Sequence, residues 1–183
     1  IPWVNYEDPV WQNEFRLADQ KYQGADDSKV NHRFRQFGEI KYCIESLKAF
    51  APNMRRCIVL IAGEAPAWLK RCEGVEIIDQ WSLCEKYAAV PTFNSQVVES
   101  CFSKIPDLAP YYLSLNDDFF YTAPVNEDFF FDSESKKIIN YVDTHSITGS
   151  DIVKFGASTD HKSMIHTAGL LAKAGYRSKH THV

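Results

Sequence analysis

Residues 116–118 read Asn-Asp-Asp and directly follow the apolar run 111–115. Carboxylate and amide oxygens are hard ligands, which Mg²⁺ or Mn²⁺ prefers when the ion also holds a diphosphate. Asp117 and Asp118 are therefore candidate metal-binding residues. Asn and Asp also form turns where strands end, so the spacing alone leaves a simple turn as the alternative.

A second candidate is the start of a predicted helix, where Thr92, Asn94 and Ser95 lie. The free backbone N–H groups and the positive dipole end of a helix can receive a phosphate. Capping of the helix would explain the same residues equally well, because Thr and Asn are common N-caps. The sequence leaves both interpretations open.

Two arginines and a glutamate form the third candidate. Arg33 and Arg35 could bind a phosphate, and Glu39 could bind a metal or accept a proton. A solvated helix face with a favourable N-terminal glutamate is the alternative. His180 and His182 could transfer a proton or belong to an unstructured tail.

Alternating strands and helices must position these segments. Apolar residues at helical spacing, beginning at Ile40 and ending near Ala51, predict a helix. The continuous apolar run at 57–62 is typical of a strand buried on both faces of a parallel sheet. The predicted strands span residues 57–62, 75–78, 111–115 and 137–142, and the predicted helices span residues 40–51, 93–105 and about 162–173. This order predicts an α/β fold with a mostly parallel sheet, flanking helices and ligands beyond the carboxyl ends of the strands.

Composition excludes some classes of function. The 183 residues carry a formal charge of −4, which gives no global attraction to nucleic acid, and no apolar run is long enough to span a bilayer. The five cysteines lack zinc-binding spacing.

Five blocks, in this order, resemble the Stealth family. That family includes bacterial capsular polysaccharide phosphotransferases and the α/β subunit of the lysosomal-enzyme N-acetylglucosamine-1-phosphotransferase. The blocks are residues 3–11 (WVNYEDPVW), 33–42 (RFRQFGEIKY), 90–99 (VPTFNSQVVE), 105–108 (IPDL) and 115–118 (LNDD).

The resemblance implies a GT-A-like α/β fold and transfer of sugar-1-phosphate from a nucleotide sugar such as UDP-GlcNAc to a glycan or glycoprotein acceptor, with Mg²⁺ or Mn²⁺. It implies that residues 1–183 form a single catalytic domain, incomplete at both ends, whose first strand precedes Trp3. The location would be the Golgi lumen in a eukaryote, or the cytoplasm or membrane surface in a bacterium.

The resemblance also assigns roles to residues. It places four residues in catalysis: Glu39, Asp117, Asp118 and His182. It places seven in substrate binding: Asn5, Asp8, Arg33, Arg35, Thr92, Asn94 and Ser95. Asp117 and Asp118 are the metal ligands, and the two arginines would neutralise donor phosphate.

The chain departs from the family pattern at several positions. Tyr6 replaces a glycine, Glu45 replaces an arginine and Ala62 replaces a polar residue. Gln36 and Gln80 also differ from the pattern. Two alternatives therefore stand beside the transferase: a catalytically impaired homologue that acts as a binding module, and a conventional glycosyltransferase that releases a nucleoside diphosphate.

Overall fold

The computed structural model describes most of the first 138 residues and a few positions near residue 170. The described residues are 1–22, 36–132, 134–135, 137–138, 167, 169–170 and 173–175. The chain divides into two units, residues 1–133 and 134–183. Arg33, Arg35, His180 and His182 lie outside the described residues. No helix within the described part of the chain is long and apolar enough to cross a membrane.

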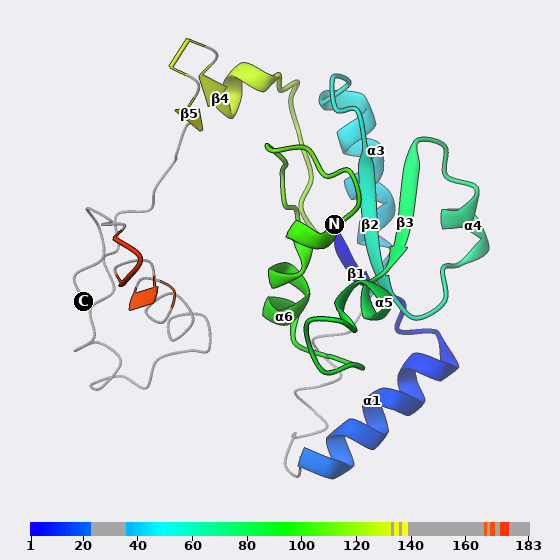
Figure 1. The fold of residues 1–183 in the computed structure, drawn as a ribbon. Helices are drawn as coiled ribbons and strands as arrows, with labels where there is room; N and C mark the ends of the chain where they lie inside the picture. Colours follow the sequence, from blue (N-terminus) through cyan, green and yellow to red (C-terminus); the bar gives the residue numbers. More distant parts are fainter. Residues whose placement is uncertain are drawn as a thin grey trace, which may run out of the picture. The chain divides into compact units, whose positions relative to one another are not determined.

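A parallel sheet of three strands forms the centre of the first unit (Figure 1). The strands are β1 (Pro2–Val4), β2 (Cys57–Ala62) and β3 (Val75–Asp79), in the spatial order β1-β2-β3. Val4 lies opposite Ala62, and Ile61 lies opposite Asp79. The carboxyl ends of all three strands therefore meet at one edge of the sheet, as the α/β prediction required.

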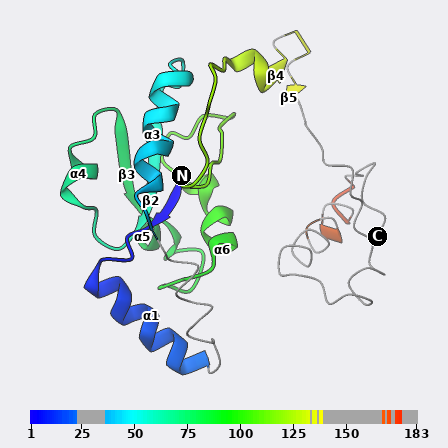
Figure 2. The same ribbon diagram turned by 180° about the vertical axis from the view of Figure 1, so that it is seen from behind.

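Helices α3 and α4 cover one face of this sheet, and α5, α6 and η1 cover the other (Figures 1 and 2). The helices are α1 (Pro9–Tyr22), α3 (Glu39–Phe50), α4 (Ala67–Lys70), α5 (Gln80–Cys84) and α6 (Ser95–Ser100), with 3₁₀ turns η1 (Phe102–Lys104) and η2 (Glu127–Phe129). The parallel sheet with helices on both faces confirms the predicted fold class.

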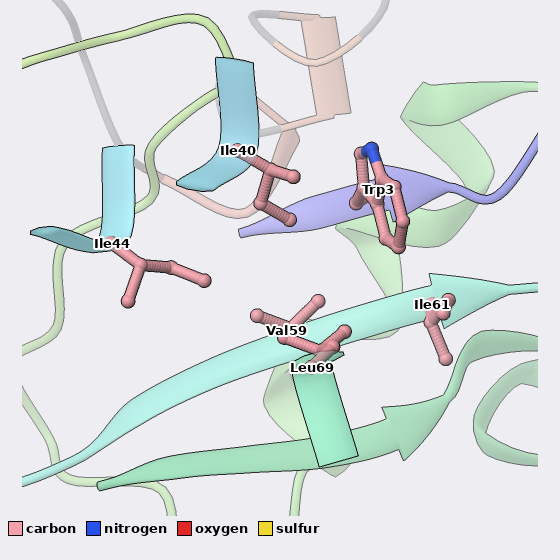
Figure 3. Close-up of a cluster of buried hydrophobic side chains, with 6 residues drawn as sticks. All are labelled: Trp3, Ile40, Ile44, Val59, Ile61 and Leu69. Carbon is pink, nitrogen blue, oxygen red and sulfur yellow. The ribbon is translucent and has the colours of Figure 1, made fainter. Parts of the chain in front are cut away.

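The central strand β2 is buried on both faces because its side chains alternate between two cores. Val59 and Ile61 pack toward α3 and α4, in the cluster drawn in Figure 3. Leu60 packs on the opposite face with Val98 of α6 and Phe102 of η1. Burial of each such side chain contributes roughly 1.5–3 kcal/mol to folding. These two cores hold the carboxyl edge of the sheet in place.

Helix α3 and strands β2 and β3 confirm the corresponding predictions, whereas the helix predicted at 93–105 is shorter. The side chain of Asn94 accepts a hydrogen bond from the N–H of Gln96 (3.0 Å), so α6 begins at Ser95. Ser100 Oγ donates to the carbonyl of Val97 (2.7 Å), a local bond that competes with the regular helix. The helix ends there, and η1 continues the chain.

The strand predicted at 111–115 is wrong. The residues form no strand, because the following segment pairs its backbone with α3 instead of the sheet. The N–H of Tyr121 donates to Ser46 Oγ (3.1 Å), and the N–H of Val125 donates to the carbonyl of Phe50 (2.7 Å). Leu115 packs against the buried side of α3.

Both ends of the described chain also differ from expectation. The sequence predicted no strand at the start of the chain, but Trp3 lies in β1. The strand that the family resemblance places before Trp3 stays a prediction. The sequence analysis missed α1, although the Asp8-Pro9 pair is a usual helix start. The two-residue strands are β4 (Phe131–Asp132) and β5 (Lys137–Ile138). β5 lies in the segment 137–142 but is not part of the parallel sheet, and residues 139–142 lie outside the described part. In the predicted helix at 162–173, the described residues 167, 169–170 and 173 are helical.

Candidate active site

Helix α3 positions the Asn-Asp-Asp turn, because the segment that carries the turn lies along one side of this helix. Cys43 Sγ donates to the carbonyl of Asn116 (3.7 Å), and Ser46 Oγ accepts the N–H of Tyr121 (3.1 Å). Both α3 residues face the segment, one turn of helix apart. The turn at 117–118 is thus attached to a helix that is itself packed on the sheet.

Three carboxylates gather at this turn. Burial raises the pKa of Asp117, and the nearby negative charges of Asp118 and Glu39 raise it further. Asp117's own backbone N–H and the Ile1 ammonium act in the opposite direction. Glu39 lies in the first turn of α3, where its carboxylate accepts the N–H of Phe37 (2.6 Å). Glu39 and Asp118 therefore lie near enough to Asp117 for their charges to act on it, and all three were predicted to be catalytic.

Asn5 lies at the carboxyl end of β1 and joins it to the loop that follows β2. Its N–H donates to the carbonyl of Ala62 (2.9 Å), and its Nδ2 donates to the carbonyl of Glu64 (2.7 Å). The predicted substrate-binding role of Asn5 stays a prediction, and its position at the carboxyl edge agrees with that role.

Asp8 has a structural role. Its carboxylate is buried and accepts the N–H groups of Val10 (3.4 Å), Trp11 (3.1 Å) and Glu64 (3.2 Å). It therefore caps the start of α1 and attaches that helix to the loop after β2. Gly63 permits this approach, since a Cβ there would lie 2.9 Å from Asp8 Oδ2.

Thr92, Asn94 and Ser95 lie at the start of α6. Thr92 is buried, its Oγ1 accepts the N–H of Asn94 (3.4 Å), and its carbonyl accepts Trp81 Nε1–H (3.3 Å). Asn94 and Ser95 are exposed, and Asn94 caps the six-residue helix. Capping accounts for Asn94, and the predicted substrate-binding role of these three residues stays a prediction.

Phe93 joins this segment to α1. Its ring lies 5.6 Å from that of Trp11, 5.1 Å from that of Phe15 and 6.1 Å from that of Trp81, each in an edge-on arrangement. The aromatic cluster therefore holds the start of α6 beside the helix that Asp8 caps. Gln36 joins the segment before α3 to the end of β1. Its Nε2 donates to the carbonyl of Val4, and Gln36 itself lies three residues before Glu39.

Comparison with known proteins identifies the family. Stealth protein conserved region 2 matches residues 33–139, more than half of the chain. The chain belongs to the Stealth family. The matched region includes Glu39 and the Asn-Asp-Asp turn, so the three gathered carboxylates lie within the Stealth conserved region.

Curated proteins with similar sequences are named as polysaccharide phosphotransferases. A capsular polysaccharide phosphotransferase of Aeromonas hydrophila is 33% identical over 90% of this chain and 47% of its own length. An exopolysaccharide phosphotransferase of Mycobacterium leprae is 31% identical, over 70% of this chain and 24% of its own. A capsular polysaccharide phosphotransferase of Haemophilus influenzae is 31% identical, over 70% of this chain and 36% of its own length. The chain thus spans at most about half the length of these Stealth relatives.

Three of the departures from the Stealth pattern are Glu45, Tyr6 and Ala62. Glu45 is exposed on α3 and pairs with Lys48 (3.4 Å). Tyr6 lies in a turn with its ring 5.7 Å from that of Trp11. Ala62, the third, is fully buried at the end of β2. The charge of Glu45 is not among those that shift the pKa of Asp117.

Sequence reasoning missed the aromatic residues beside the carboxylates. A hollow of about 380 Å³ is lined by Leu115, Asp118, Phe119, Phe120 and Tyr121. The ring of Tyr42 on α3 lies 6.5 Å from that of Phe120. Tyr42 follows Glu39 by three residues, and two phenylalanines follow the acidic pair, so helical spacing and adjacency could have found them.

The carboxylates can be tested for their fit to a metal ion. Within the described residues, no three His, Cys, Asp or Glu side chains form a group that could hold one. Mg²⁺, however, usually keeps several waters and binds one or two carboxylates together with substrate phosphates. Asp117 and Asp118 are adjacent, and burial together with the charge of Asp118 raises the pKa of Asp117, so the pair would fit such a site.

Proposed function

We propose that the chain is a catalytic part of a sugar-1-phosphate transferase that uses a nucleotide sugar and a glycan acceptor. The observation that carries the proposal is the group of Glu39, Asp117 and Asp118, held along α3 within the Stealth conserved region. The relatives support the reaction class, because all three are named as polysaccharide phosphotransferases.

Asp117 and Asp118 would hold Mg²⁺ or Mn²⁺ together with the diphosphate of the donor. When bound, the ion would neutralise charge on the phosphate that is attacked. Glu39 would accept the proton of the acceptor hydroxyl, since it is the remaining carboxylate of the group. Arg33, Arg35 and His182 remain candidates for phosphate neutralisation and proton transfer.

The proposed reaction forms a bond between the acceptor oxygen and the β-phosphorus of the donor. The bond between the β-phosphorus and the oxygen bridging it to the α-phosphate breaks, and UMP leaves. The acceptor's proton passes to Glu39 and the sugar stays attached to its own phosphate. A conventional glycosyltransferase would break the bond between the sugar and the β-phosphate instead and release UDP.

The position of the β-phosphate after the reaction tests the proposal. UDP-GlcNAc labelled with ³²P at the β-phosphate is incubated with the protein, Mg²⁺ and a glycan acceptor. Label in the glycan, with unlabelled UMP released, supports the proposal. Label that stays in UDP refutes it and identifies a glycosyltransferase. The variant Asp117→Asn should lose the reaction, whereas Asp128→Asn, at an exposed carboxylate in η2, should keep it.

A further inference from the structure

Two buried cysteines lie on the face of the sheet that α5 and α6 cover. Cys84 is the last residue of α5, and Cys101 directly follows α6, 17 positions further along the chain. Both side chains are buried, with 0% and 2% of their surface exposed. The two thiols form a hydrogen bond with each other. Their sulfur atoms are therefore neighbours, although they come from separate helices.

Contacts on either side of the cysteine pair hold its two chain segments together. Leu83, directly before Cys84, packs on the apolar core that α6 and η1 share. One turn after Cys84, the ring of Tyr87 lies 4.8 Å from Nζ of Lys104. The N–H of Tyr87 donates to the carbonyl of Cys84 (2.8 Å). In the same way, the N–H of Lys104 donates to the carbonyl of Cys101 (2.9 Å). The backbone beside each sulfur is thus held in place by contacts other than the thiols themselves.

The other three cysteines lie on the opposite face of the sheet, which α3 and α4 cover. Cys43 belongs to α3, and its Sγ donates to the carbonyl of Asn116 (3.7 Å). Cys57 of β2 and Cys72 after α4 pack against the core of that face. Sγ of Cys72 also lies 3.4 Å from Nζ of Lys48. Because all five cysteines belong to the described residues, the sheet separates these three thiols from the pair between α5 and α6.

We propose that Cys84 and Cys101 form an intramolecular disulfide when the chain folds in the presence of a disulfide oxidant. One cysteine attacks the oxidant and releases its first thiol, and the other cysteine attacks the resulting mixed disulfide and releases the second. Two cysteine thiols are oxidised to one S–S bond, and the oxidant disulfide is reduced to two thiols, which take up the two protons. The bond joins α5 to α6 covalently. This inference is independent of the proposed transferase activity.

The bond forms during folding rather than in the folded chain. Burial and, after it, the hydrogen bond with Cys101 raise the pKa of the Cys84 thiol to about 12. Because the thiolate is the nucleophile in disulfide exchange, the folded thiol does not react at neutral pH. Oxidation therefore takes place while the folding chain still exposes both cysteines, and burial then shields the finished bond from reductants.

Refolding of the purified chain tests the pair. The reduced chain is unfolded in urea and refolded either in a mixture of oxidised and reduced glutathione or in dithiothreitol. Free thiols are then blocked with iodoacetamide, and protease fragments are identified by mass spectrometry. We expect a fragment that links Cys84 to Cys101 after refolding with glutathione. Because a disulfide that closes a loop of this length stabilises a domain of this size, the linked chain should have a Tm roughly 6–12 °C above that of the reduced chain.

Cysteine variants separate this pair from the thiols on the other face. The double variant Cys57→Ser, Cys72→Ser is the control and should keep both the linked fragment and the rise in Tm. Cys84→Ala and Cys101→Ala should each abolish the difference in Tm between the two refolding mixtures. A refolded wild-type chain with both Cys84 and Cys101 alkylated, or with either one linked to another cysteine, would overturn the proposal. So would a linked chain that melts no higher than the reduced one, because the bond would then strain the native contacts.

Discussion

Replacement of Asp8 by alanine should destabilise the protein, because the carboxylate caps α1 and accepts a hydrogen bond from a distant loop. Loss of a helix cap costs about 0.5–2 kcal/mol. The N–H of Glu64 loses its partner as well, at about 1–3 kcal/mol for a buried group. Because that N–H lies in a half-buried region, we expect a total of about 2–4 kcal/mol. For a chain of this size, that loss lowers the Tm by roughly 4–16 °C.

Urea denaturation followed by circular dichroism measures the effect. Asp8→Asn should lose less stability than Asp8→Ala, because the amide oxygen still accepts one or two of the N–H groups. Glu7→Ala, at the exposed neighbouring position, is the matched control and should change little. If Asp8→Ala were as stable as wild type yet lost donor binding, the structural role would be refuted and the predicted substrate-binding role supported.

Three further substitutions test other parts of the account. Gly63→Ala should cost about 1–3 kcal/mol, measured by urea denaturation, because its φ of +89° is strained for alanine and the new Cβ would lie 2.9 Å from Asp8 Oδ2. Glu45→Ala should change stability by less than about 0.5 kcal/mol, since its pair with Lys48 is exposed. A larger loss would show that the family departure at Glu45 matters to folding. Asp117→Asn should stabilise the metal-free protein at pH 7. Because folding raises the pKa of Asp117, the ionised form opposes folding, so this advantage should shrink as pH falls through the raised pKa and vanish below the ordinary value of 3.8. Denaturation with a chelator at several pH values would contradict the assignment if the difference between variant and wild type stayed constant.

The sequence predicted the helices and strands in which the spacing of apolar residues alone shows which side chains are buried. The apolar stripe of α3 and the continuous run of β2 each match the core that they enter, so their periods were sufficient. β1 was missed because it has only three residues, too few for a period. Residues 111–115 are as apolar as a strand, but the segment that follows them pairs its backbone with side chains and carbonyls of α3. These contacts between distant segments cannot be read from the apolar pattern of residues 111–115.

The candidate site was predictable in part. Family motifs pointed to Glu39, Asp117 and Asp118, and in the structure the charges of Glu39 and Asp118 act on Asp117 although Glu39 lies 78 positions before it. The motifs could not distinguish an aspartate that binds a ligand from one that caps a helix. The carboxylate oxygens of Asp8 accept backbone N–H groups, and the same oxygens would bind a ligand. The motifs also passed over Tyr42 and Phe120, whose contact depends on how the turn lies along α3.

Calorimetric titration of UDP-GlcNAc into the chain, with and without Mg²⁺, is the sharpest test of a donor site at these carboxylates. The account predicts binding that requires the metal, is lost in Asp117→Asn and is retained in the exposed control Asp128→Asn. Equal binding without Mg²⁺, or unchanged binding by Asp117→Asn, would contradict the assignment of the donor site to the carboxylates on α3 and the Asn-Asp-Asp turn.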